Sequence, residues 1–142
     1  MESTLLGLVL DSSVLISAER RKLTPERAIE TVRNSAGEIP IVLCALTIVE
    51  IGHGIYRANT QEIRDRRRAF LDELKATMPI HPVTAATAEI VARVGGEQAA
   101  RGVILPLADL IIGACALELG YAVGTSNIRD FARIPDLGLV HL

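Results

Sequence analysis

Short continuous runs of apolar residues recur along the chain, separated by longer segments in which apolar and polar positions alternate at helical spacing. Short apolar runs are typical of strands buried on both faces, as in parallel sheets. The pattern therefore predicts strands at Leu5–Leu10, Ile41–Leu46, Tyr121–Gly124 and Leu137–Leu142, and a short strand or extended link at Ile80–Val83.

The segments between these runs predict amphipathic helices with recognisable ends. Thr24, Thr60 and Thr84 are expected N-caps, and Gly120 is expected to end the helix that follows Pro106. The pair Gly95-Gly96 either interrupts its helix or lets a neighbouring element approach closely. Strands alternating with helices predict an α/β fold, with a central, mostly parallel sheet covered by helices on both faces.

Composition supports this fold class and limits the function classes. The chain has 142 residues, 49% of them hydrophobic, with no Trp and few aromatic residues. One domain over residues 1–142 with an aliphatic core fits these values better than a β-sandwich does. The net charge is only −2, so binding to nucleic acid would have to use a local basic patch.

The cysteines and the N-terminal segment indicate where in the cell the protein is found. Cys44 and Cys115 lie in apolar surroundings and are expected to be small buried side chains, which form neither a disulfide framework nor a zinc site. The segment Met1–Leu10 has no basic region and too short an apolar run for a secretion signal. No apolar stretch is long enough to cross a bilayer. We expect a cytoplasmic protein that does not associate with membranes.

Four acidic residues stand out by their positions. Asp11 follows the first predicted strand, Glu50 begins a helix after the second, and Asp130 follows a later strand. Asp109 lies in an otherwise apolar helix. Because parallel strands end at the same edge of a sheet, the four carboxylates can converge there and raise one another's pKa. A hard divalent cation such as Mg²⁺ or Mn²⁺ would relieve this repulsion and could polarise a phosphoryl oxygen.

Each of three acids also has a purely structural interpretation. Asp11 or Ser12 could be an ordinary helix N-cap. Glu50 could form a capping box with Thr47. Asp109 could occupy the first turn of its helix, where the helix dipole favours a negative charge. The sequence leaves these alternatives open.

The helix that follows Thr60 is rich in arginine. Its basic residues alternate with acidic ones, which is typical of a solvated helix with ion pairs four residues apart. The alternative is a patch that binds RNA phosphates. Its candidate residues are Arg64, Arg67 and Arg68.

Two glycines lie four residues after an acid. Gly54 follows Glu50, and Gly113 follows Asp109, at a spacing that places each glycine beside the carboxylate on one helix face. A missing side chain there would either leave room for a backbone phosphate or allow two helices to pack closely. The sequence does not decide between these hypotheses.

Four segments together resemble one known family, the PIN domain, and in particular the VapC-type toxins of toxin–antitoxin pairs. Their order, spacing and predicted context all match, so the resemblance covers essentially the whole chain and implies a three-layer α/β/α fold. The segments are LVLDSSVLI at Leu8–Ile16, LTIVEIGHGI at Leu46–Ile55, PLADLIIGACAL at Pro106–Leu117 and TSNIRDFARIP at Thr125–Pro135.

The resemblance implies an endoribonuclease toxin that depends on Mg²⁺ or Mn²⁺ and cuts RNA, often a tRNA or rRNA. It also implies a homodimer and a cognate VapB-like antitoxin. The family's acids fall on Asp11, Glu50, Asp109 and Asp130. Asp11, Asp109 and Asp130 would bind metal, and Glu50 would orient or deprotonate the attacking water or complete a second metal site. Neutral hydrogen-bonding support would come from Ser12, Ser13, Thr125 and Asn127.

Two positions depart from the family pattern. Ser13 stands where relatives often have Asn, and Ala108 precedes Asp109 where many have a polar residue. Both departures leave the four acids in place, so we expect them to affect rate or substrate rather than the presence of activity.

Three other functions are compatible with parts of this pattern. A receiver-like signalling domain would need paired acids after the first strand and a late lysine, but Ser12 and Ser13 follow Asp11, and no lysine follows Lys75. A PIN scaffold without catalysis would not need the acids, all four of which are present. A PIN nuclease that is not a toxin would be distinguished by the absence of a neighbouring antitoxin gene.

Overall fold

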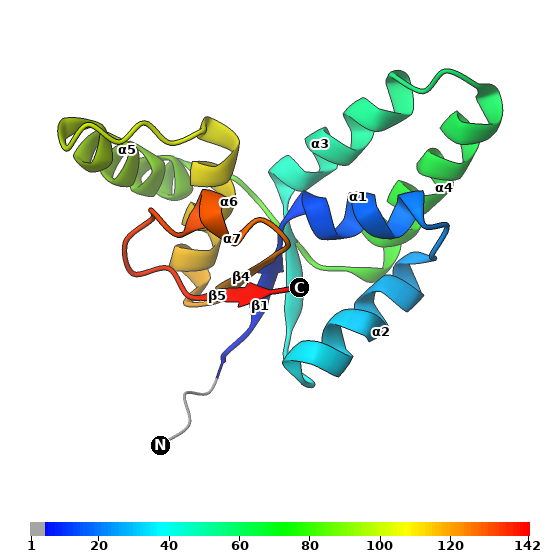
Figure 1. Cartoon of the computed structure of the whole chain (residues 1–142), viewed down its shortest axis with the longest axis horizontal. Coiled ribbons are helices and arrows are strands. Elements are labelled where there is room, and N and C mark those ends of the chain that lie inside the picture. The colour runs from blue at the N-terminus through cyan, green and yellow to red at the C-terminus, as the bar shows by residue number, and fades with distance from the viewer. Residues whose placement is uncertain (1–4) are drawn as a thin grey trace.

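A parallel five-stranded sheet lies at the centre of the protein, between two layers of helices (Figure 1). The coordinates are a computed structural model that describes residues 5–142, so the first four residues of the predicted domain lie outside the described part. The strand order is β3-β2-β1-β4-β5, and every neighbouring pair is parallel. The strands are β1 (Leu8–Leu10), β2 (Ile41–Cys44), β3 (Ile80–His81), β4 (Ala122–Thr125) and β5 (Leu139–His141).

Each face of the sheet has its own helical layer and its own core. The first layer consists of α1 (Ser12–Arg20), α2 (Pro25–Ala36), α3 (Ala45–Tyr56) and α4 (Gln61–Thr77). The second consists of α5 (Ala85–Ala100), α6 (Leu107–Leu119) and α7 (Ile128–Phe131). Because successive side chains of a strand point to opposite faces, Leu8 and Leu10 pack under the first layer and Val9 under the second.

The order of the strands changes direction beside β1, and this place is called the switch point of the sheet. From β1 the chain proceeds to β2 and β3 on one side, then returns through α5 and α6 to place β4 on the other side. The carboxyl ends of β1 and β4 therefore lie next to each other while their following segments diverge. In open α/β sheets, ligands bind in the crevice that such a divergence leaves.

Most of the predicted helix ends are confirmed. The hydroxyls of Thr24, Thr60 and Thr84 each accept a hydrogen bond from the backbone N–H three residues later. Gly120 ends α6 in the left-handed region, with φ of 71°. Gly95 does not interrupt α5. A Cβ there would lie 3.0 Å from Leu110 Cδ1, so the glycine lets α6 approach closely.

All five predicted strands differ from the observed bounds by one or more residues, and two of these errors have a clear cause. The run Ile41–Leu46 is a strand only as far as Cys44, because α3 begins at Ala45, before the apolar run ends. The run Leu5–Leu10 forms ladder pairs only over Leu8–Leu10. Continuous hydrophobicity indicates burial, but it does not show where strand pairing stops.

The two cysteines are buried as expected, and they also lie in contact. Cys44 Sγ and Cys115 Sγ are 2.9 Å apart, and both side chains are fully buried as free thiols. This contact joins the end of β2 to the middle of α6. None of the helices within residues 5–142 combines the length and the apolar character needed to span a bilayer.

Candidate active site

A pocket of about 530 Å³ lies at the switch point, beyond the carboxyl ends of β1 and β4. All four predicted acids line it, although they come from four different segments of the chain. Three of the four predicted supporting residues line it as well. Its walls are formed by Asp11, Ser12, Ser13, Ile16, Ser17, Arg20, Arg21, Glu50, Asp109, Asn127 and Asp130.

Asp11 is the most buried of the four acids, with 6% of its surface exposed. It occupies the N-cap position of α1, as the structural alternative proposed, but its side chain makes no capping hydrogen bond. Instead its Oδ2 accepts hydrogen bonds from Ser13 Oγ at 2.7 Å and from Thr125 Oγ1 at 2.9 Å. Thr125 Oγ1 in turn accepts from the Asn127 N–H at 2.8 Å. This chain of hydrogen bonds fixes the orientation of the carboxylate.

Glu50 does not belong to a capping box. Since Cys44 is the N-cap of α3, Thr47 lies inside the helix, and its buried hydroxyl has no hydrogen-bond partner among the described residues. Glu50 Oε1 instead accepts from Ser12 Oγ at 3.0 Å. Burial raises the pKa of Glu50, and the charge of Asp11 adds to this, whereas the Ser12 hydrogen bond lowers it.

Asp109 lies in the first turn of α6, where its structural interpretation placed it. The helix dipole favours a carboxylate there, yet the pKa of Asp109 is raised to about 6. Burial is the largest cause, followed by the charges of Asp130, Asp11 and Glu50. Burial and three neighbouring carboxylates therefore act against the ionised form of Asp109 in this pocket.

The raised pKa of Asp109 predicts a pH-dependent stability in the metal-free protein. A carboxyl whose pKa is higher in the folded state stabilises the fold at low pH, and this contribution is lost as the pH rises through about 6. Asp109→Asn removes the charge, so we expect a higher urea midpoint than wild type at pH 8 and a smaller gain at pH 5. Urea unfolding in EDTA measures this. A gain that is equal at both pH values would contradict the assignment.

The donor set of this pocket fits a hard divalent cation. Carboxylate and hydroxyl oxygens are the ligands that Mg²⁺ and Mn²⁺ prefer. A cation would also relieve the repulsion between carboxylates, which adds to burial in raising the pKa of Asp109. In their present positions, no three His, Cys, Asp or Glu side chains within residues 5–142 form a group that could hold an ion. The carboxylates therefore share one pocket without forming a tight cage.

The later residues of α1 also line this pocket, which the sequence did not predict. Ser17, Arg20 and Arg21 line it together with Ser13, which was predicted. The spacing from Ser13 to Ser17 and on to Arg20 and Arg21 places all four on one side of a helix, a signal that was available in the sequence. As a result, two guanidinium groups lie at the edge of an acidic pocket.

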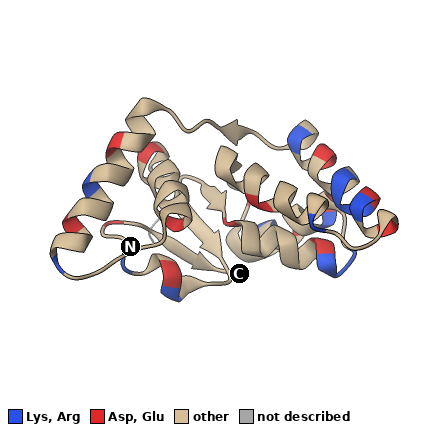
Figure 2. Ribbon diagram, turned by 90° about the horizontal axis from the view of Figure 1, so that it is seen from above, with Lys and Arg blue, Asp and Glu red and all other residues tan. Residues whose placement is uncertain are grey.

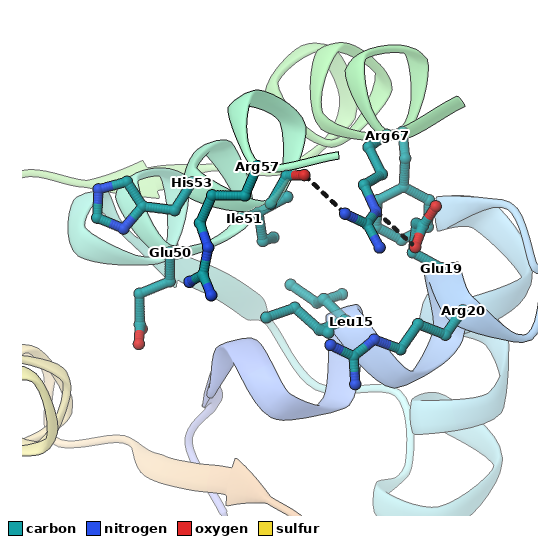
Figure 3. Close-up of a pocket in the computed structure, with 11 residues that line it drawn as sticks. Leu15, Glu19, Arg20, Glu50, Ile51, His53, Arg57 and Arg67 are labelled. Atoms are coloured by element: carbon teal, nitrogen blue, oxygen red, sulfur yellow. Dashed lines mark hydrogen bonds and ion pairs between the residues drawn. The ribbon is translucent and has the colours of Figure 1, made fainter. Parts of the chain in front are cut away.

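A second pocket of about 400 Å³ lies beside the first, between α1, α3 and α4 (Figure 3). Ile16, Arg20 and Glu50 line both pockets. The second pocket has apolar side chains on its walls, together with several charged ones at its edge. It is lined by Leu15, Ile16, Glu19, Arg20, Glu50, Ile51, His53, Gly54, Arg57, Arg67 and Phe70.

None of the three arginines predicted to bind RNA lines the acidic pocket. Basic and acidic residues alternate on α4 (Figure 2). The three arginines also make intramolecular contacts. Arg64 donates to the Ala58 carbonyl, Arg67 to the Gly54 carbonyl, and Arg68 to Tyr56 Oη. Of the ion pairs four residues apart that the structural alternative expected, Arg68 forms one with Asp72, and a role in RNA binding stays a prediction.

The two glycines lie in different surroundings. A Cβ on Gly113 would lie 2.8 Å from Ile134 Cδ1, so this glycine allows α6 to pack closely on the segment after α7, and the access hypothesis is wrong there. Gly54 faces Arg67, whose Nη1 would lie 3.7 Å from an added Cβ. It lines the second pocket rather than the acidic one.

Comparison with known proteins gives a consistent result. The family model for the PIN domain matches residues 8–137. The chain is 30% identical to ribonuclease VapC1 of Rickettsia felis over 132 residues, which cover 93% of each protein. It is 29% identical to ribonuclease VapC of Rickettsia bellii with the same coverage.

Solved structures show the same fold. A chain of the VapBC2 complex of Rickettsia felis, bound to a DNA fragment from its promoter, superimposes with a TM-score of 0.81 at 20% identity. The superposition covers 96% of this chain and 98% of that one. A chain of VapBC-5 from Mycobacterium tuberculosis gives a TM-score of 0.73 at 27% identity, with 96% and 99% coverage. The family model, the identity over almost the full length and the shared fold agree that this chain belongs to the PIN-domain family.

Proposed function

We propose that this protein is an endoribonuclease toxin that hydrolyses phosphodiester bonds in RNA and is neutralised by a cognate VapB-like antitoxin. The observation that carries the proposal is the meeting of Asp11, Glu50, Asp109 and Asp130 in one pocket at the switch point of the sheet. The relatives named above are ribonucleases of the VapC type, and they match along almost their full length. A cytoplasmic tRNA or rRNA is the proposed substrate.

Mg²⁺ or Mn²⁺ is the proposed cofactor, held by Asp11, Asp109 and Asp130. Such an ion supplies charge stabilisation at a phosphoryl oxygen and lowers the pKa of a bound water. Mg²⁺ keeps several of its waters and commonly uses only one or two carboxylates of the protein. Carboxylates that share a pocket without forming a tight cage are therefore compatible with it.

The chain's own residues prepare the site for hydrolysis. Ser13 and Thr125 both donate to Oδ2 of Asp11, and among the described residues no side chain donates to Oδ1, which leaves that oxygen for a ligand. Ser12 holds Glu50 through Oε1. Because the pKa of Glu50 is raised, its carboxylate is a better proton acceptor than an exposed one, which suits the orientation and deprotonation of a water.

Two kinds of protein partner are proposed. The matched structures from Rickettsia felis and Mycobacterium tuberculosis are VapBC complexes, which supports an antitoxin of the VapB type for this chain. A homodimer is proposed from the family resemblance. In this structure Ile104 and Leu107, which are 75% and 65% exposed before and at the start of α6, provide apolar surface for one of these contacts.

The direct test is cleavage of total RNA and of a tRNA pool by the purified, antitoxin-free chain. We expect cutting with Mn²⁺ or Mg²⁺ and none in EDTA, because the carboxylates alone cannot stabilise the charge that develops on phosphate. Fragment ends would identify the substrate. A folded protein that is supplied with metal and cuts none of these RNAs would favour the scaffold function instead.

A further inference from the structure

The second pocket has an apolar floor beneath a charged edge. Leu15, Ile51 and Phe70 form the floor, and each is at most 6% exposed. Its volume of about 400 Å³ lies within the roughly 300–1,000 Å³ typical of small-molecule sites. The pocket is therefore large enough for one planar, partly apolar group.

The charges around this pocket are unequal. Glu19 is neutralised within the structure, since Arg66 Nε lies 2.9 Å and Arg67 Nε 3.7 Å from its carboxylate oxygens. Arg20 and Arg57 reach into the pocket from opposite sides, one from α1 and one from the end of α3 (Figure 3). Within residues 5–142, no acidic side chain forms an ion pair with either guanidinium group. The pocket thus offers two positive charges without ion-pair partners above an apolar surface, and the carboxylate of Glu50 lies where this pocket meets the acidic one.

We propose that this pocket binds the nucleotide next to the scissile phosphate, with Arg20 and Arg57 holding its phosphate and the apolar floor contacting its base. This inference rests on the proposed ribonuclease function. Its structural basis is continuity, because Arg20, Ile16 and Glu50 line both pockets. An RNA strand whose scissile phosphate lies at the four carboxylates passes directly into the second pocket.

A nucleotide satisfies the chemistry of the pocket better than an acidic peptide does. The guanidinium groups of Arg20 and Arg57 lie beside an apolar floor. This arrangement suits a ligand with one anionic group and one flat apolar group. RNA presents this combination at every residue of the strand, and single-stranded RNA is commonly bound through phosphate contacts together with contacts to its bases.

The test uses Arg57→Gln, because Arg57 lines only the second pocket and its side chain makes no hydrogen bond or ion pair with a described residue. Arg20→Gln is the second variant, and Arg93→Gln, an exposed change on α5 in the other layer, is the matched control. The probe is a fluorescein-labelled single-stranded RNA hexamer, and the readout is its fluorescence anisotropy in EDTA. Urea midpoints of all three variants should equal that of wild type.

We expect each variant of the pocket to weaken RNA binding about tenfold, as the loss of one charged hydrogen bond does. The slope of log K against log salt should fall by about 0.7 for each arginine removed. In cleavage assays with metal, Arg57→Gln should raise KM while kcat stays within about threefold, since uniform binding is what is lost. Arg93→Gln should change none of these values.

The outcomes separate this inference from the function on which it rests. If wild type neither binds nor cuts RNA, the proposed function itself fails. If wild type does both and Arg57→Gln binds RNA with unchanged affinity and salt slope, the nucleotide site is overturned. The same conclusion follows if Arg57→Gln keeps its RNA affinity but loses binding to an Asp- and Glu-rich peptide, which would make the pocket a protein-binding site.

Discussion

Asp11→Asn is expected to lower the rate of RNA cleavage about a thousandfold, because it weakens the binding of the proposed metal ion, whose positive charge is worth several kcal/mol in stabilising the transition state. The change keeps the size of the side chain. The carboxamide oxygen of Asn still accepts the hydrogen bonds that Ser13 and Thr125 donate to Asp11, so the local structure should persist. The measurement is kcat/KM on the RNA that wild type cleaves, with Mg²⁺ and with Mn²⁺.

The matched control is Asp65→Asn, which makes the same chemical change on the exposed surface of α4. It should cleave at the wild-type rate. Urea unfolding should show that the Asp11 variant is folded. A folded Asp11→Asn that cuts within tenfold of wild type would mean that the activity comes from a contaminant or from other residues.

Phe131→Ala is expected to destabilise the protein by about 3–5 kcal/mol, the usual cost of removing a buried phenyl ring. Phe131 is 1% exposed and is the only buried residue of the four-residue helix α7. So short a helix does not form without tertiary contacts. The ring therefore also holds Asp130, its neighbour in sequence, at the acidic pocket. Urea denaturation would measure the loss of stability.

Arg129→Ala serves as its control, since Arg129 is exposed on the same helix and should change stability by less than about 0.5 kcal/mol. We also expect Phe131→Ala to cut RNA more slowly under conditions in which it remains folded. A loss of stability below about 1 kcal/mol would show that α7 is anchored elsewhere.

The sequence predicted those features that local signals determine. Thr24, Thr60 and Thr84 cap helices as expected, because a hydroxyl that accepts from an N–H three residues later is a local interaction. The positions of Asp11 and Asp130 after strands indicated a shared edge of the sheet. Their presence in one pocket follows from topology, provided that the strands are parallel.

Features that depend on tertiary packing were not predictable in this way. The pattern from Thr47 to Glu50 matches a capping box, but the pairing of Cys44 with His81 extends β2 to that residue, and α3 begins directly after it. The second pocket depends on how α1 meets α3 and α4, which no short pattern records. Whether the guanidinium group of Arg57 forms an ion pair likewise depends on which acidic side chains lie near it in the fold.

The return of the chain from β3 to β4 divides the acids equally between two parts of the sequence. Asp11 and Glu50 precede the exposed residues Arg101 and Gly102, and Asp109 and Asp130 follow them. A break at this point would leave two carboxylates on each fragment, and in the intact chain the two parts are joined by the β1–β4 ladder and the contacts of α5 with α6. We therefore expect neither fragment to be active alone, so that recovered activity would report that two proteins fused to the fragments have come together.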